Sequence, residues 1–163
     1  MSFHLGDASN PFTALSLHVE RGQTMKINPY LSFRGDCEAA FKLYERCFGG
    51  QPGSIFRYAG SPMADQVPPD WQEKVMHGSL TIGEQVLMGG DVAPGSYEQP
   101  KGFALSIAIE STSDAERIIH ELAEGGSVTL PLEPTFWAAR FGMVVDRFGI
   151  PWMISCEEGE SKK

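Results

Sequence analysis

The chain carries little positive charge. Its 163 residues include 13 Lys and Arg against 21 Asp and Glu, which gives a formal net charge of −8 at pH 7. A nucleic-acid surface needs clustered basic side chains, and attraction to anionic lipid depends on the same charges. We therefore expect neither nucleic acid nor a membrane surface as a partner, while a local basic pocket stays compatible with the composition.

Long apolar runs and paired cysteines are missing as well. No run approaches the roughly 20 apolar residues that cross a bilayer, and residues 1–24 lack the basic start and apolar core of a secretory signal. The three cysteines, Cys37, Cys47 and Cys156, cannot all pair within one chain, and their spacing matches neither CxxC nor a zinc pattern. A reduced, cytoplasmic setting is the expectation that follows.

An internal duplication is the most informative feature that the chain does have. An apolar strand at 30–33 leads to a helix opening at Asp36, and a strand at 104–109 leads to a helix opening at Ser113. Both helices stop at a Gly-Gly pair, and Ser113-Asp114-Ala115-Glu116 has the pattern of a capping box. A repeat of this kind places any chemistry between the halves rather than inside one.

Each half is predicted as one strand, one helix and three further strands. Proline-rich polar segments at 59–72 and 92–101 are predicted as loops. Further strands are expected at 54–58, 74–82, 85–89, 127–132, 140–146 and 150–155, with a turn at Gly89-Gly90-Asp91.

The predicted fold class is α+β. Two tandem βαβββ modules, residues 25–91 and 101–156 with a linker at 92–100, place mainly antiparallel sheets side by side. The sheets curl into a shared cleft, and the helices pack outside. Residues 1–24 are expected to be a poorly ordered N-terminal extension, and residues 157–163 a charged tail.

Several segments, taken in order, match a known family. They are Pro29-Tyr30-Leu31-Ser32-Phe33, Ala39-Ala40-Phe41-Lys42-Leu43-Tyr44, Phe48-Gly49-Gly50, 75–83, Phe136-Trp137, Gly142, Asp146-Arg147-Phe148-Gly149 and Trp152. Through them the chain resembles the PhnB-like group of the vicinal oxygen chelate superfamily, which includes glyoxalase I, extradiol dioxygenases and the fosfomycin and bleomycin resistance proteins. The resemblance covers residues 25–156 and implies the glyoxalase/bleomycin-resistance-like fold. It also implies a homodimer, in which sheets from two chains complete the cleft.

The resemblance implies where a divalent metal would bind. In the superfamily the metal is held by His and Glu side chains from facing strands, and its open positions take substrate oxygens. The matching positions here are Asn28 or Pro29, His77, residues 104–106, and Met153 or its neighbours. Only His77 is an ordinary ligand, since Met153 suits soft metals alone. We therefore expect no cofactor, with a divalent metal as the disfavoured alternative. A methyltransferase description given to some PhnB-like proteins is not carried over, because no Gly-rich strand-turn-helix loop is present.

His77 is the candidate catalytic residue. It occupies a strand position that faces the cleft by analogy, and an imidazole can act as a general acid or base or orient a ligand near neutral pH. The structural alternative is a core histidine that hydrogen-bonds to a neighbouring strand or to Asp91.

Large side chains on the predicted strands fit an apolar ligand cavity, although such residues are also typical of plain core. Arg57 and Arg140 have two interpretations, an anion-holding side chain in the cleft or a surface arginine. Trp71 ends a proline-rich loop, where a lid over the cleft and a dimer contact are equal alternatives. The expected ligand-binding residues are Phe33, Phe56, Arg57, Trp71, Met88, Trp137, Arg140 and Trp152.

The leading hypothesis is a PhnB-like, glyoxalase-like protein that binds a small organic molecule in the inter-module cleft without a tightly bound metal. Whether it is an enzyme stays open at this point. Two alternatives also stay open. One is a divalent-metal-dependent lyase or dioxygenase of the superfamily, and the other is a dimeric interaction module without catalysis.

Overall fold

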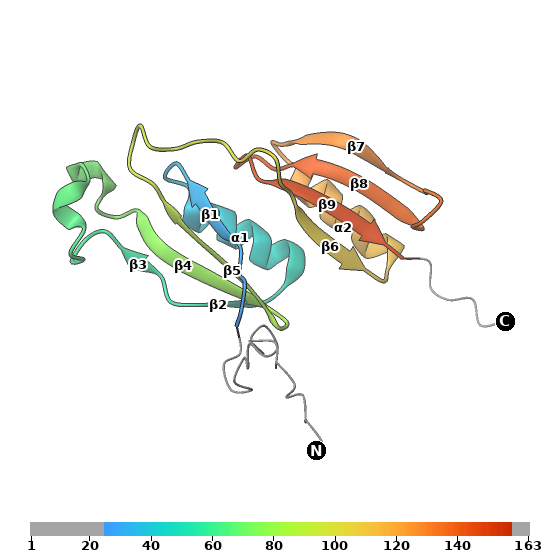
Figure 1. Cartoon of the computed structure of the whole chain (residues 1–163), viewed down its shortest axis with the longest axis horizontal. Coiled ribbons are helices and arrows are strands. Elements are labelled where there is room, and N and C mark those ends of the chain that lie inside the picture. The colour runs from blue at the N-terminus through green and yellow to red at the C-terminus, as the bar shows by residue number, and fades with distance from the viewer. Residues whose placement is uncertain (1–24, 158–163) are drawn as a thin grey trace, which may run out of the picture.

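The computed structural model describes residues 25–157, and the predictions for the N-terminal extension and for most of the tail lie outside them. Two modules follow each other along the chain (Figure 1). The first contains β1 (Tyr30–Phe33), α1 (Cys37–Phe48), β2 (Gln51–Pro52), β3 (Phe56–Arg57), the 3-10 turns η1 (Ala64–Gln66) and η2 (Pro69–Trp71), β4 (Val75–Ile82) and β5 (Gln85–Asp91). The second contains β6 (Leu105–Ile109), α2 (Thr112–Ala123), β7 (Ser127–Glu133), β8 (Arg140–Val145) and β9 (Pro151–Cys156).

Each module builds one sheet with the same topology. The strand order is β1-β5-β4-β2 in the first sheet, with β3 also on β4, and β6-β9-β8-β7 in the second. The first strand of each module runs parallel to the last, while the other pairs are antiparallel. The predicted α+β fold of two repeated, mainly antiparallel modules is confirmed.

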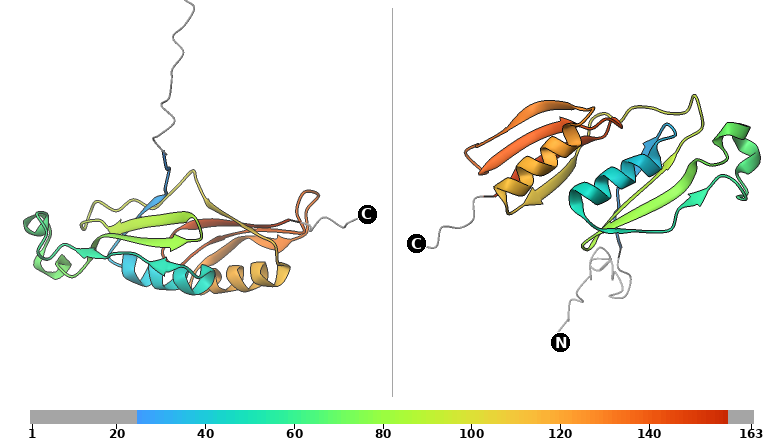
Figure 2. Two further views of the ribbon diagram at one scale, coloured as in Figure 1. Left: turned by 90° about the horizontal axis from the view of Figure 1, so that it is seen from below. Right: turned by 180° about the vertical axis from the view of Figure 1, so that it is seen from behind.

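Both helices cover the same side of the two sheets and lie next to each other (Figure 2). Strand side chains alternate accordingly, because successive residues point to opposite faces. In β1, Leu31 and Phe33 are buried beneath the helices, whereas Tyr30 is half exposed on the other side. We call the side of the sheets away from α1 and α2 the open face.

One hydrophobic core runs through both modules. Tyr44 of α1 packs edge-on against Trp152 of β9, with ring centroids 5.0 Å apart, and its hydroxyl donates a 2.7 Å hydrogen bond to Asp146. Phe33 and Phe148 meet across the same boundary at 6.4 Å. Because these contacts join residues of different modules, neither half would keep its core alone.

The helix starts differ from the sequence prediction. Ser111, not Ser113, caps α2, and its Oγ accepts a 3.2 Å hydrogen bond from the amide of Asp114. The helix therefore begins earlier than the capping-box pattern indicated. Asp36 does precede α1, but its side chain makes no capping bond. The amide of Cys37 donates instead to Asp91 at 2.9 Å.

Three other elements also differ. Of the predicted strand at 54–58 only Phe56–Arg57 forms a strand, β3, and the separate strand β2 precedes it at Gln51–Pro52. The predicted loop at 59–72 contains η1 and η2. Gly89-Gly90-Asp91 is not a turn. It is the end of β5, paired with Leu31, Ser32 and Phe33 of β1.

None of the helices in residues 25–157 has the length and apolar character to cross a membrane. The cysteines are all free and buried. Burial, together with the Asp91 carboxylate, raises the pKa of Cys37, and burial with the nearby Glu121 raises the pKa of Cys47 to about 12.

We expect the native cysteines to resist Ellman's reagent at pH 8, because thiolate is the reactive form and all three sulfurs are buried. Full denaturation in guanidinium chloride should release three reactive thiols per chain. Rapid reaction of one thiol in the native protein would contradict this burial.

Candidate functional site

Three aromatic side chains meet on the open face of the first sheet. The imidazole of His77 stacks on the Tyr30 ring, with centroids 5.7 Å apart and planes inclined by 22°. The Phe56 ring lies 6.3 Å from His77 on another side. We call Tyr30, Phe56 and His77 the aromatic cluster. Tyr30 and Phe56 are 51% and 54% exposed, so the cluster is open to solvent.

The strand register explains how residues so distant in sequence meet. Phe56 of β3 lies directly opposite His77 of β4. Tyr30 of β1 reaches β4 across the intervening strand β5, because Gly90 of β5 has no side chain. A Cβ atom on Gly90 would lie 3.0 Å from the Tyr30 hydroxyl and 2.4 Å from the Met76 carbonyl oxygen. This crossing was not recognisable before the register was known.

The polar atoms of the cluster lie together. The Nδ1 atom of His77 is 3.4 Å from the Tyr30 hydroxyl, which also donates a 3.4 Å hydrogen bond to the Met76 carbonyl oxygen. Burial raises the pKa of Tyr30, so its hydroxyl stays protonated at neutral pH and remains a donor. The cluster thus presents an imidazole and a phenol at one place, the groups used in proton transfer and ligand orientation.

Asp91 is not the partner of His77. Its carboxylate accepts 2.9 Å hydrogen bonds from the amides of Gly35, Cys37 and Val75, and it is buried. Asp91 therefore ties the start of α1 to β4, and the suggested hydrogen bond between His77 and Asp91 is wrong.

The two candidate arginines are held elsewhere. Arg57 forms a 2.9 Å ion pair with Glu38 and donates to the Glu73 carbonyl oxygen. Arg140 lies 3.8 Å from Glu116 of α2 and donates to the Ala139 carbonyl oxygen. Arg140 is directed toward α2 and does not reach the aromatic cluster, and its pairing with Glu116 is the arrangement of a surface arginine, the second interpretation given above.

The candidate tryptophans are spread over the molecule. Trp71 of η2 packs beside Gly35 and under the Lys74 ammonium group, 5.7 Å from its ring centroid. Trp152 is buried, and its indole donates a 2.8 Å hydrogen bond to Asp146. Trp137 is exposed in the β7–β8 connection, edge-on to Phe141 at 5.6 Å.

Of the remaining candidates, one lies at the cluster and one in the core. Met88 of β5 is opposite Tyr30 on one side and Ser79 on the other, so it borders the cluster. Phe33 has 0% exposure and packs against Phe41, so it supports the sheet rather than lining a cavity.

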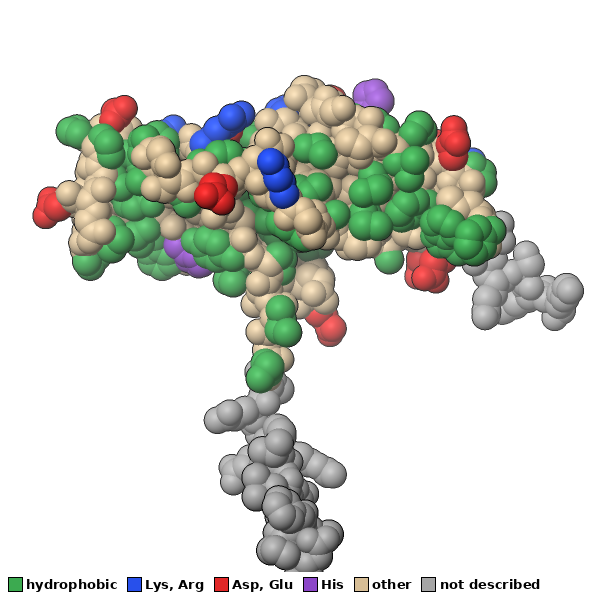
Figure 3. All heavy atoms as spheres, turned by 45° about the horizontal axis from the view of Figure 1, so that its top comes forward, with side chains coloured by type: hydrophobic (Ala, Val, Ile, Leu, Met, Phe, Trp, Pro, Cys, Tyr) green, Lys and Arg blue, Asp and Glu red, His purple; other side chains and the backbone are tan. Residues whose placement is uncertain are grey.

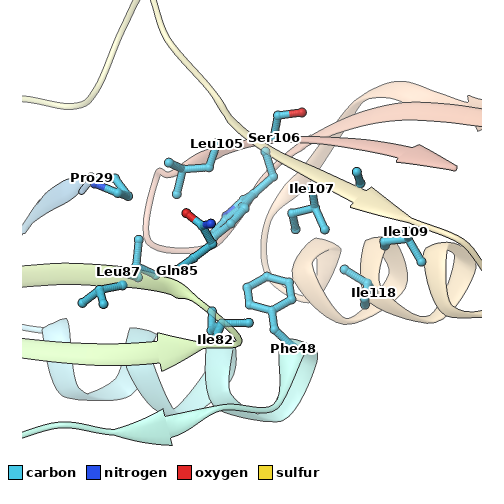
Figure 4. Close-up of a pocket in the computed structure, with 13 residues that line it drawn as sticks. Pro29, Phe48, Ile82, Gln85, Leu87, Leu105, Ser106, Ile107, Ile109 and Ile118 are labelled. Carbon is cyan, nitrogen blue, oxygen red and sulfur yellow. The ribbon is translucent and has the colours of Figure 1, made fainter. Parts of the chain in front are cut away.

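A second feature is an apolar groove between the modules, and of the ligand-binding residues expected from the sequence only Trp152 lines it. Its volume is about 450 Å³, and it lies between the β4–β5 hairpin and β6 (Figure 4). Every residue of β6 lines it, because the outer edge of this strand pairs with no other strand of the described chain. We call it the inter-module groove. Its lining residues include Pro29, Phe48, Ile82, Leu87, Leu105, Ile107, Ile109, Ile118 and Trp152.

The donor set does not fit the metal site that the superfamily implies. Of the matching positions, Pro29 has no donor side chain. Ser106 and Met153 lie opposite each other on the second sheet, whereas His77 lies on the first sheet. Within residues 25–157 no three His, Cys, Asp or Glu side chains are placed to hold a metal ion. A hard or borderline divalent ion requires several such ligands, so the residues present do not fit one.

Comparison with known proteins places this geometry in a family. The model of the Glyoxalase/Bleomycin resistance protein/Dioxygenase superfamily matches residues 26–154. Protein YjdN of Escherichia coli (strain K12) is 30% identical over 139 residues, which cover 80% of this chain and 95% of that protein.

Two solved structures are also similar. Protein PA1353 from Pseudomonas aeruginosa is 44% identical, with a TM-score of 0.76 over 83% of this chain and 100% of that one. A PhnB protein from Bacillus cereus, described as a putative 3-demethylubiquinone-9 3-methyltransferase, has a TM-score of 0.70 at 24% identity, over 81% of this chain and 99% of that one. At that identity the likeness shows the fold alone. The resemblance noted in the sequence is confirmed, and the chain belongs to the glyoxalase/bleomycin resistance protein/dioxygenase superfamily.

Proposed function

We propose that this protein binds a small organic molecule against the aromatic cluster, in a cleft that a second copy of the chain completes over the open face. The observation that carries the proposal is the exposed stack of Tyr30, His77 and Phe56. Exposed aromatic rings grouped around a few polar atoms are typical of ligand sites. No tightly held metal is part of the proposal.

The chemistry of the cluster favours a ligand with a flat apolar part and one polar group. The rings of Phe56 and Tyr30 offer the apolar contact, and the imidazole of His77 offers one donor or acceptor. If the bound molecule reacts, His77 is the candidate acid or base, and the phenol 3.4 Å away orients it. A carboxylate or phosphate ligand is less favoured here, because Arg57 and Arg140 are paired with Glu38 and Glu116.

The homodimer is proposed from uncovered apolar surface. Figure 3 shows hydrophobic side chains exposed over both modules. Phe103, Trp137, Val128 and Leu130 are all more than 40% exposed. Aromatic side chains on a surface mark interaction sites, and an unpaired edge strand such as β6 invites pairing.

The ligand site is tested with a fluorescent aromatic probe, 8-anilinonaphthalene-1-sulfonate. We expect saturable binding, and we expect Phe56→Ala to weaken it about 10-fold or more, because removing a contacting ring costs about 1.5–3 kcal/mol. Phe136→Ala is the matched control, since that ring is 97% exposed and lies outside the cluster. Equal affinities in the wild type and both variants would refute the site.

The interface is tested by placing a charge on the exposed edge of β6. Ala108→Arg should shift the sedimentation equilibrium from dimer toward monomer, because a buried unpaired charge opposes association. Ala39→Arg on the exposed side of α1 should leave the dimer intact. A dimer that tolerates Ala108→Arg would move the interface away from β6.

A further inference from the structure

A polar hollow separate from both features above lies at the boundary of the two modules. Its volume is about 330 Å³. The first module contributes Arg34, from the β1–α1 connection, and the linker contributes Tyr97 and Gln99. The second contributes the glycine pair before β7, Ser127 at the start of β7, and residues 145–149 at the end of β8 and in the turn that follows it. No residue of the hollow belongs to the aromatic cluster or the inter-module groove.

The two arginines of this hollow, Arg34 and Arg147, differ from the other arginines of the described chain. Residues 25–157 contain six arginines, and four of them form ion pairs with Glu or Asp. Arg34 and Arg147 form none within these residues, although acidic residues outnumber basic ones in the whole chain, 21 to 13. Two unpaired guanidinium groups at one hollow make a local positive site in an acidic protein.

Aromatic stacking holds both guanidinium groups in place. The Arg34 guanidinium carbon lies 5.9 Å from the Tyr97 ring centroid, and that of Arg147 lies 5.0 Å from the Phe148 centroid. The side chain of Arg147 also passes close over Gly125. A Cβ atom added to Gly125 would lie 3.4 Å from the Cβ atom of Arg147. Stacking leaves the N–H groups in the guanidinium plane free to donate, and less side-chain entropy is lost on binding.

The buried carboxylate beneath the hollow does not compete for the arginines. Asp146 is 3% exposed, and its two oxygens accept four hydrogen bonds, from the amides of Phe148 and Ile150, the Tyr44 hydroxyl and the Trp152 indole. Asp36 is the other acidic neighbour. Burial raises the pKa of the Tyr97 phenol, and the Asp36 and Asp146 carboxylates add to this rise while Arg34 opposes it. That phenol therefore stays protonated and can donate.

We propose that the hollow binds the phosphate or carboxylate group of a small molecule, held between Arg34 and Arg147. Each guanidinium offers a planar fork that matches two oxygens of such an anion. The Tyr97 hydroxyl and the Gln99 amide add two neutral donors at the same rim. Because the arginines come from different modules, a bound anion would bridge them.

The test is a titration of the full chain with inorganic phosphate, and separately with succinate, at constant ionic strength with chloride as the balancing anion. Amide chemical shifts of Gly125, Gly126 and Gly149 are the readout. We expect at least one of the two anions to shift them to saturation, which also separates phosphate from carboxylate. Arg34→Gln and Arg147→Gln should each weaken binding about 10-fold or more, because each variant loses a charge-assisted hydrogen bond to the anion.

Arg46→Gln is the control, since Arg46 is a surface arginine paired with Glu121 and Glu124. It should bind like the wild type. Both hollow arginines are exposed, so unchanged melting temperatures will show that their variants fold. Linear, non-saturating shifts with both anions, or equal affinity in the Arg34→Gln, Arg147→Gln double variant, would overturn the site.

Discussion

Asp146→Ala is expected to destabilise the protein by about 4 kcal/mol or more, the largest effect of any single substitution considered. Its carboxylate accepts bonds from Phe148, Ile150, Tyr44 and Trp152, and all of these donors would lose their acceptor in a buried place. Each buried donor left unpaired costs about 1–3 kcal/mol. Urea denaturation followed by far-UV circular dichroism measures the change in the free energy of unfolding.

Tyr44→Phe and Asp146→Asn separate the parts of this network. Tyr44→Phe removes one donor and should cost about 1–2 kcal/mol, while it keeps the ring that packs against Trp152. Asp146→Asn keeps one acceptor oxygen, so its loss of stability should lie between those of Tyr44→Phe and Asp146→Ala. A loss below about 1 kcal/mol for Asp146→Ala would mean that the network does not join the modules.

Gly90→Ala is expected to cost about 3 kcal/mol and to disturb the aromatic cluster at the same time. The new Cβ would lie 2.4 Å from the Met76 carbonyl oxygen and 3.0 Å from the Tyr30 hydroxyl, distances at which backbone must move. Overpacking of this kind typically costs about 1–3 kcal/mol. Because Met76 precedes His77, the imidazole would lose its place beside Tyr30.

Gly78→Ala is the matched control on the neighbouring strand. Its Cβ would meet first the Phe41 ring, at 3.2 Å, and a side chain can shift more easily than backbone. We expect a smaller loss of stability and unchanged binding of the aromatic probe. If Gly90→Ala bound the probe as the wild type does, the crossing of Tyr30 over β5 would not matter for the site.

The sequence predicts elements well where the signal is local. Strand β1 begins directly after Pro29 and lies at a sheet edge, as a proline without a donor requires. The apolar stripes of both helices face the core, as their spacing indicates. The hairpin between β4 and β5 turns at Gly83 and Glu84. The duplication then predicts the architecture of two similar modules, because the apolar surface of each module must be buried against the other.

Prediction fails where a contact spans the sequence. The cap of α1 comes from Asp91, 54 residues beyond Cys37, so the local pattern indicated Asp36 instead. The two interpretations of Arg140, an anion holder in the cleft and a surface arginine, stayed open because nothing in the sequence shows that Glu116 lies beside it. These are tertiary contacts, and residue types and spacing alone do not contain them.

The candidate site shows the same division. His77 was singled out from the sequence, but Tyr30, its stacking partner, was not among the expected site residues. The two come together only through the β1–β5–β4 register and the missing side chain of Gly90. Most residues that line the inter-module groove were missed for a related reason, since the outer edge of β6 is recognisable only once the strand order is known.

A native mass spectrum of the protein, purified without added metal or chelator, tests the central claim most directly. We predict a homodimer without stoichiometric metal, and an organic adduct on that dimer would identify the ligand class of the aromatic cluster. A monomer would contradict the cleft shared by two chains. One metal ion per chain, lost in His77→Ala, would contradict the metal-free site and support a metal-dependent enzyme instead.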